Sequence, residues 1–178
     1  MKPLFTIHEG EFLVGDHIIR NLGNKYDVWI PAKDNGVDLL VTPTSGPGKP
    51  VKLQVKFSRG FNPKSIPAEK LLGWGWYTLN PAKIKSSKAN AWVFVILTLQ
   101  HNPYFILIPT AELKKRIPSG SSSIWYLYLA AFSNGKCYDM RGVARSDIKK
   151  ILDDVPTDPS RDFTAFLQNW DVLDTARK

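Results

Sequence analysis

Strict alternation of apolar and polar residues over 51–57 is the feature that most constrains how this chain folds. The segment reads Val-Lys-Leu-Gln-Val-Lys-Phe. Side chains of a strand point alternately to its two faces, so the pattern predicts a β-strand with one apolar and one polar face. Lys52, Gln54 and Lys56 form the polar face. In the plainest interpretation, that face only meets water.

A second predicted strand precedes this one and carries an acid near its start. Residues 35–41 read Asn-Gly-Val-Asp-Leu-Leu-Val, and the acid is Asp38. The connecting residues 42–50 are rich in proline, glycine, serine and threonine, which is typical of a turn. A hairpin through this turn sets Asp38 opposite Gln54, with Lys56 beside them on the same face. We therefore expect an acid, an amide and an amine to gather at one end of the hairpin.

An aspartate, a spacer and then Gln-Val-Lys on a hairpin resembles the active-site motif of the PD-(D/E)XK nuclease superfamily. That superfamily includes restriction endonucleases, Mrr-like nucleases and archaeal Holliday-junction resolvases. The resemblance implies that Asp38, Gln54 and the Val55 backbone carbonyl hold Mg²⁺ or Mn²⁺. It also implies that Lys56 positions or activates the attacking water. The chain departs from the motif at Val37, which replaces a proline, and at Gln54, which replaces an acid and so removes a negative ligand.

The order of predicted elements also resembles the core of that superfamily. A helix, three strands and a helical turn come first, and further strands alternate with short helices. We expect an α/β or α+β fold, with a restriction endonuclease-like mixed β-sheet flanked by helices. At 178 residues the chain is long enough for a single domain with its own core. We assign the core to residues 6–108 and a C-terminal elaboration to residues 109–178, and the motif match covers roughly residues 6–57.

The first predicted helix carries an acid on its apolar stripe. The helix starts near Thr6, where Thr6-x-x-Glu9 fits a capping box, and it stops at Gly23. Glu11 falls within the stripe, where a carboxylate needs a cation or hydrogen bonds. Either Glu11 bends out to solvent, or it faces the metal site. An acid of the first helix lies in the active site of many PD-(D/E)XK proteins, so the resemblance implies that Glu11 completes the outer shell or holds a second ion.

Positive charge is concentrated next to the predicted site. The chain has a net charge of +8, and the segment 49–88 accounts for all of it, because the remaining residues balance. A solvated basic face is one interpretation. A groove for a polyanion is the other, since the excess begins at the predicted site. On the second interpretation the nucleic-acid contacts come from Lys52, Arg59, Lys64, Lys83 and Lys85.

Two aromatic segments each leave a choice. Residues 73–77 read Gly-Trp-Gly-Trp-Tyr, and their rings either pack in the core or stack on nucleic-acid bases. Near the C-terminus, Asp158-Pro159 predicts the start of a final helix with an apolar face that extends to Leu173. Docking of that face on the core is the simpler interpretation, and binding of a partner is the other.

Together these features predict a hydrolase, a Mg²⁺-dependent endodeoxyribonuclease of PD-(D/E)XK type. Its substrate is nucleic acid, with double-stranded DNA as the expected form. The catalytic residues are Glu11, Asp38, Gln54 and Lys56, which we expect to converge on one concave site. The alternative is a domain of the same fold that binds nucleic acid but whose catalytic site has decayed. A homodimer is possible, since cleavage of a duplex often uses two active sites.

Cysteine content and hydropathy bear on the compartment. The one cysteine, Cys137, excludes an internal disulfide and a cysteine-cluster zinc site. This composition suits a reducing cytosol, so we expect a cytoplasmic protein. No apolar run approaches the roughly 20 residues of a membrane span, so no membrane association is predicted.

Overall fold

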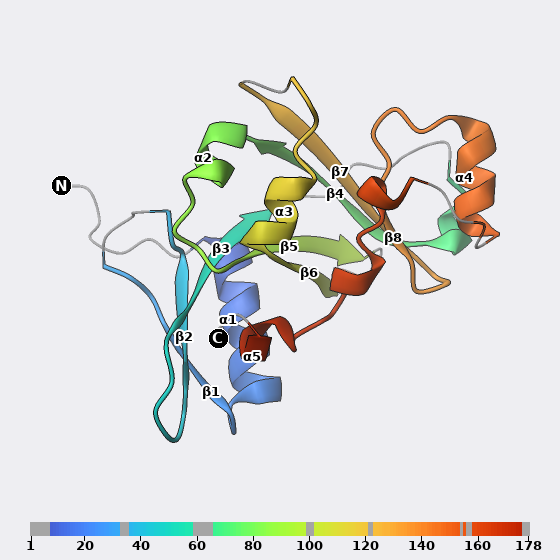
Figure 1. Ribbon diagram of the computed structural model, residues 1–178. Helices are drawn as coiled ribbons and strands as arrows, with labels where there is room; N and C mark the ends of the chain where they lie inside the picture. The colour runs from blue at the N-terminus through green and yellow to red at the C-terminus, as the bar shows by residue number, and fades with distance from the viewer. Residues whose placement is uncertain are drawn as a thin grey trace.

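The computed structural model describes residues 8–32, 36–58, 66–98, 102–120, 123–153, 155 and 158–175. Within them, eight strands form one mixed sheet with helices against its faces (Figure 1). The strands are β1 (Tyr26–Trp29), β2 (Leu39–Pro43), β3 (Val51–Phe57), β4 (Leu71–Leu79), β5 (Ala91–Thr98), β6 (Pro103–Pro109), β7 (Trp125–Phe132) and β8 (Cys137–Asp139). The predicted class, a mixed sheet flanked by helices, is confirmed, and the layout is consistent with a restriction endonuclease-like arrangement.

The helices are short apart from the first. They are α1 (Glu9–Leu22), α2 (Pro81–Lys85), α3 (Thr110–Lys115), α4 (Arg145–Leu152) and α5 (Val172–Thr175). Single 3₁₀ turns span Ala68–Lys70, Pro159–Arg161 and Thr164–Phe166. No helix of the described residues is long and apolar enough to cross a membrane.

The predicted hairpin is present. β2 and β3 pair antiparallel with Leu39 opposite Leu53, and the Asp38 amide donates a hydrogen bond of 2.8 Å to the Leu53 carbonyl. The polar face of β3 does not simply meet water, because Gln54 is only 9% exposed. Cross-strand neighbours share a face, so this register puts Asp38 and Gln54 on the same side of the sheet.

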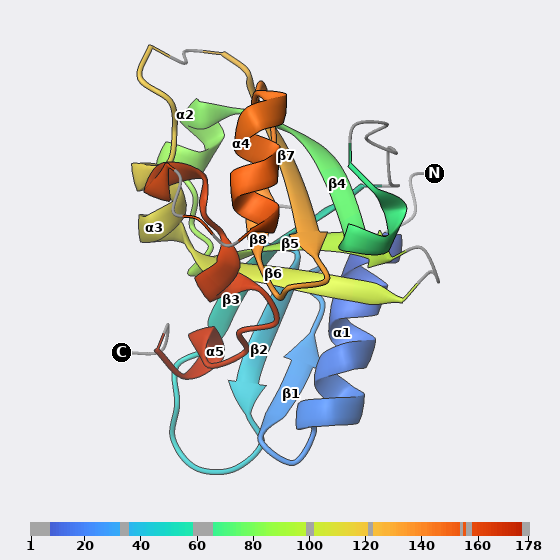
Figure 2. The same cartoon turned by 90° about the vertical axis from the view of Figure 1, so that its right-hand side faces the viewer.

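Strand β5 organises the centre of the sheet. It pairs parallel with β3 through Leu53–Phe57 and antiparallel with β6 along its other edge. Beyond the end of β3, β4 pairs with the same edge of β5 that β3 occupies, with Gly73 opposite Thr98. β4 then runs on beside β7, and β7 beside β8, so that β4 and β7 cross over β5 and β6 (Figure 2).

Glycine permits this crossing. A Cβ on Gly73 would lie 2.6 Å from the Leu97 carbonyl oxygen, and one on Gly75 would lie 2.9 Å from an Ile96 methyl group. At Gly73 the two backbones approach so closely that only hydrogen fits, and at Gly75 the space is filled by the side chains of Tyr77 and Ile96. The helical turn predicted after the third strand is a 3₁₀ turn that ends at Lys70, and β4 begins at Leu71.

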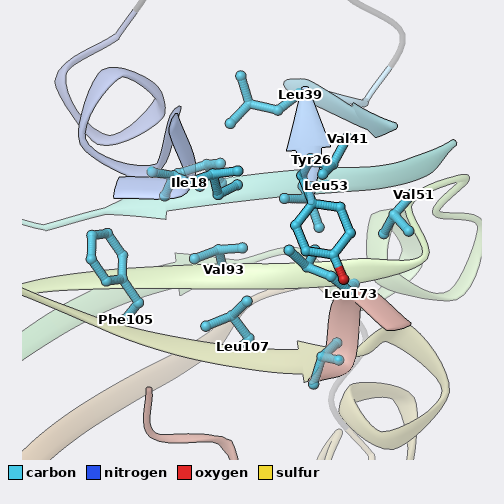
Figure 3. Close-up of a cluster of buried hydrophobic side chains, with 14 of the residues drawn as sticks. Ile18, Tyr26, Leu39, Val41, Val51, Leu53, Val93, Phe105, Leu107 and Leu173 are labelled. Carbon is cyan, nitrogen blue, oxygen red and sulfur yellow. The ribbon is translucent and has the colours of Figure 1, made fainter. Parts of the chain in front are cut away.

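Three apolar clusters hold these layers together. In the first, α1 and α5 cover one face of the sheet over β2, β3, β5 and β6, where Ile18, Leu53 and Leu107 meet (Figure 3). The second lies between the opposite face of β5 and β6 and the crossing strands β4 and β7, with α2 and α3 at its side. The third lies under α4, on the outer face of β4, β7 and β8.

The predicted start of the first helix is wrong. α1 begins at Glu9, and its N-cap is His8 rather than Thr6, which lies outside the described residues. The capping box therefore uses Glu11 in place of Glu9: the Glu11 carboxylate accepts a hydrogen bond of 3.1 Å from the His8 amide. The expected C-terminal end at Gly23 is confirmed.

The predicted C-terminal helix is also wrong, although its docking on the core is confirmed. Two 3₁₀ turns and the four-residue α5 replace it. Gln168 has a φ of 53°, and it exchanges hydrogen bonds of 2.7 and 2.9 Å with the Phe105 backbone at the edge of β6. Hydrogen bonding to the edge of β6 replaces helix formation in this segment. Phe163 and Leu173 are still buried.

Candidate active site

The Asp38 carboxylate is fixed by the strand opposite. Its Oδ2 accepts a hydrogen bond of 2.6 Å from the Val55 backbone amide and another from the Gln54 side-chain amide. The N–H and C=O of one strand residue point to the same edge of the strand. The Val55 carbonyl therefore faces the same side as Asp38, beyond the point where β2 stops pairing with β3. Carboxylate, amide and carbonyl thus meet at the end of the hairpin.

Lys56 extends from the same face of β3 as Gln54. Its side chain is half-buried, and Nζ lies 5.8 Å from the ring centroid of Trp92 on the neighbouring β5. Trp92 is opposite Gln54 in the parallel pairing of the two strands. Attraction between the ammonium and the aromatic face restricts where the lysine side chain can go. The charge is therefore held beside the hairpin site.

Glu11 reaches the site from the first turn of α1. The helix begins directly against the end of β3, because Gly10 has no side chain: a Cβ there would lie 2.5 Å from the Cβ of Phe57. Glu11 is half-buried, and burial raises the pKa of its carboxyl group. The negative charge of Asp38 also raises this pKa, whereas the hydrogen bond from the His8 amide and the positive charge of Lys56 lower it. The charges of helix and hairpin therefore act on one another.

All four predicted catalytic side chains line one cavity of about 1270 Å³. The remaining wall comes from the segment after β1, from the end of β4 and from α2. The four residues come from three separate segments of the chain. The predicted convergence of Glu11, Asp38, Gln54 and Lys56 is therefore observed, while their catalytic roles stay a prediction.

The predicted nucleic-acid contacts divide into three groups. Lys83 lines the cavity from α2. Lys52 and Lys85 are exposed, but neither belongs to the described cavity wall. Arg59 and Lys64 lie outside the described residues.

Several wall residues were not predicted from the sequence. Lys88, Asn80 and Trp92 all line the cavity. Lys88 belongs to the basic segment 49–88, so its charge was a signal that could have found it. Trp92 sits within a continuous apolar run, where it cannot be told from an ordinary core residue. Only the pairing of β3 with β5 brings it to the site.

The donor atoms at the hairpin suit a hard divalent cation. Two carboxylates, a side-chain amide and a backbone carbonyl offer oxygen ligands, which Mg²⁺ prefers in combination with retained waters. No group of three or more histidine, cysteine, aspartate or glutamate side chains able to hold a metal occurs within the part of the chain that the structure describes. The Gln54 nitrogen, not its oxygen, faces Asp38. Binding a metal through the Gln54 oxygen therefore requires the amide to turn over.

Comparison with known proteins adds no relative to this description. No family model, no curated protein and no solved structure matches the chain. The function is therefore inferred from the site itself.

Proposed function

We propose that this protein is a metal-dependent nuclease that hydrolyses phosphodiester bonds in nucleic acid, with DNA as its substrate. The observation that carries the proposal is the convergence of Glu11, Asp38 and Lys56 on one cavity. Two acids and an amine from three segments gather where Gln54 and the Val55 carbonyl add oxygen ligands. Lysines from α2 and its following loop line the same cavity, which suits a polyanion.

Each residue has a distinct task in this mechanism. Asp38, Gln54 and the Val55 carbonyl would hold Mg²⁺, and Glu11 would complete its outer shell. When bound, Mg²⁺ neutralises charge at the scissile phosphate and acidifies a water molecule. Lys56 orients the attacking water and stabilises the negative charge that develops on the phosphate as the bond to the leaving oxygen breaks. Lys83 and Lys88 bind flanking phosphates and so position the strand.

One observation favours a second candidate, a nucleic-acid-binding domain without catalysis. The hydrogen bond from the Gln54 amide satisfies part of the Asp38 carboxylate without a cation. A site that has lost its metal is more stable with glutamine than with an acid at position 54. The reason is that an amide and a carboxylate attract each other, whereas two carboxylates repel. The basic cavity would then bind the strand and cut nothing.

A cleavage assay on the purified chain separates these two candidates. Plasmid, linear duplex and single-stranded substrates are incubated with Mg²⁺, Mn²⁺ or EDTA. The test variants are Lys56→Ala and Asp38→Asn, since an asparagine oxygen can still accept the Val55 hydrogen bond. We expect metal-dependent cleavage that each variant reduces by at least about 100-fold, the lower end of a typical contribution from one such group. Binding should persist, because the lysines supply most of the ground-state affinity.

Two outcomes would count against the nuclease. Cleavage that is equal in wild type and both variants would come from a contaminant or from another site. Salt-sensitive DNA binding without cleavage, in any metal and on any substrate, would favour the binding domain. Lys149→Ala serves as the control for removal of a lysine, because Lys149 is exposed on α4 and lies outside the cavity wall.

A further inference from the structure

We infer that an exposed aromatic surface beside the cavity binds unpaired bases of the strand that the cavity holds. This surface, the aromatic ledge, consists of Trp76 on β4 and Tyr126 and Tyr128 on β7. The inference rests on the proposed function and specifies its substrate class: nucleic acid with a single-stranded segment next to the phosphate in the site.

The ledge is a defined cluster of rings. Trp76 is paired with Tyr128 across the two strands, and Tyr126 lies two residues further along β7 from Tyr128, opposite Thr78. The Trp76 ring meets Tyr126 edge-on at 6.0 Å between centroids and Tyr128 edge-on at 6.4 Å. Trp76 is nevertheless 49% exposed and Tyr126 is 40% exposed. The rings support one another, and Trp76 and Tyr126 keep surface that a ligand can reach.

This face of the sheet is covered further along the strands, where Tyr128 packs in part against the cluster under α4, whereas Trp76 and Tyr126 are exposed. Further along the same strands, Trp74 and Ala130 are buried in the cluster under α4. On the opposite face of β4, Tyr77 is buried and donates a hydrogen bond of 2.7 Å to the Val95 carbonyl. The aromatic segment 73–77 therefore divides: Trp74 and Tyr77 pack in the core, and Trp76 faces outward. Clustered exposed aromatics of this kind mark binding surfaces.

The ledge continues directly from the cavity wall. Thr78 lines the cavity, and it lies two residues from Trp76 on the same face of β4, a distance of about 7 Å along a strand. The Trp76 amide also donates a hydrogen bond of 3.0 Å to the Ser58 hydroxyl, two residues beyond Lys56. A nucleotide next to one bound in the cavity therefore comes within reach of the rings.

The combination of charges and rings selects the form of nucleic acid. Lys56, Lys83 and Lys88 line the cavity and can meet phosphates. Aromatic rings beside such a groove stack on bases, but the bases of an intact duplex are already stacked and present only their edges. Only an unpaired segment offers base faces to the ledge. The expected ligand is thus a fork, flap, gap or single strand in place of a continuous duplex.

Binding measured in EDTA tests this inference without relying on cleavage. Three labelled DNAs are compared by fluorescence anisotropy at one salt concentration: a single strand, a duplex, and the same duplex with a single-stranded arm. Trp76→Ala should weaken binding of the single strand and the forked DNA by roughly 5- to 150-fold, as expected when one base no longer stacks on a ring. Its affinity for the duplex should stay within about twofold of wild type.

Matched variants distinguish stacking from general damage. Trp76→Phe keeps an aromatic face and should retain most of the affinity, whereas Trp76→Leu keeps apolar area only and should behave like Trp76→Ala. Trp29→Ala removes a tryptophan that is 59% exposed on β1, which β2, β3 and β5 separate from β4. That control should bind all three DNAs as wild type does. If Trp76→Ala fails to fold, the comparison of Phe with Leu at position 76 decides the question.

Three results would overturn the inference. One is equal weakening of duplex and single-stranded binding in Trp76→Ala, and another is equal affinity of the Phe and Leu variants. The third is a wild-type protein that binds none of the DNAs, in which case the ledge does not bind nucleic acid and a protein becomes the candidate ligand. Failure of the nuclease proposal is distinguishable: a protein that never cuts but binds single strands through Trp76 supports the ledge alone. A protein that cuts with no dependence on Trp76 keeps the nuclease and loses the ledge.

Discussion

Asp38 and Gln54 lie opposite each other at the end of the β2–β3 hairpin, and the Gln54 amide donates a hydrogen bond to the Asp38 carboxylate. The same carboxylate oxygen accepts the Val55 backbone amide at 2.6 Å. The acid is therefore oriented by the strand that carries the amide and the lysine. Any exchange of charge at position 54 acts directly on Asp38, which makes this pair the most informative place to test the site.

Gln54→Glu should make the protein more dependent on metal. A second carboxylate at hydrogen-bonding distance from Asp38 repels it, which raises the pKa of one of the pair and lowers stability at neutral pH. In EDTA the variant should melt below wild type, and acidification should remove the difference as the pair takes up a proton. Because Mg²⁺ relieves the repulsion, we expect roughly tenfold tighter binding than in wild type, or about 3–6 °C more thermal stabilisation at saturating Mg²⁺.

The control for this variant is the double change Asp38→Asn with Gln54→Glu. It restores a pair of one acid and one amide, so the melting temperature in EDTA should return towards that of wild type. Equal stabilisation of wild type and Gln54→Glu by Mg²⁺, measured by differential scanning fluorimetry, would show that residue 54 does not contact the ion.

Glu11→Gln separates helix capping from catalysis. Glutamine can still accept the hydrogen bond from the His8 amide, so α1 should keep its cap. Burial raises the pKa of Glu11, so ionising this group costs stability in the folded state once the pH exceeds its ordinary pKa. The variant should therefore match wild type at low pH and melt at an equal or higher temperature at neutral pH.

Metal-dependent cleavage by Glu11→Gln should nonetheless fall, because the charge facing the cation is removed. The wild-type rate should rise with pH as the Glu11 carboxyl group ionises, and that rise should be missing from the pH–rate profile of the variant. A variant that cuts at the wild-type rate with an unchanged profile would assign Glu11 to capping alone.

Lys83→Ala combined with Lys88→Ala should flatten the salt dependence of DNA binding. Each phosphate that a lysine no longer neutralises reduces the slope of log K against log salt by about 0.9, so the double variant should show a slope smaller by about 1.8. Lys149→Ala, on α4, should leave the slope unchanged. The measurement is a DNA titration at several salt concentrations, and an unaltered slope in the double variant would mean that the cavity lysines meet only solvent.

Gly10→Ala should disturb the site through packing. The new Cβ would lie 2.5 Å from the Cβ of Phe57, which cannot move without shifting β3, so α1 must move instead. We expect a decrease of about 1–3 kcal/mol in the free energy of unfolding and weaker cleavage, since Glu11 moves with the helix. In Gly15→Ala, in the same helix, the nearest neighbour of the new Cβ is a Val28 methyl group at 3.8 Å. The free energy of unfolding of this variant should rise by up to about 1 kcal/mol. Urea denaturation compares the two, and equal stabilities would contradict the prediction.

The β2–β3 hairpin and the first helix were predictable because their patterns are local. Alternation over Val51–Phe57 gives a strand with those bounds, and the turn between the strands sets the register that brings Asp38 to Gln54. The position of Glu11 within an apolar stripe pointed to an acid that does line the cavity, although the capping box was assigned too early in the chain. Side-chain periodicity follows directly from backbone geometry, so these features need no knowledge of the rest of the chain.

The remainder depends on contacts between segments far apart in the sequence. Nothing local in residues 73–77 says that two glycines let β4 cross β5, or that Trp76 faces outward while Trp74 and Tyr77 are buried. The last segment has the apolar spacing of a helix, yet the free edge of β6 offers Gln168 backbone partners that a helix would forgo. The sequence alone determined the hairpin and the polar groups at its end. Tertiary packing decided which lysines and aromatic rings surround them, because burial and edge pairing are settled only when the whole sheet is assembled.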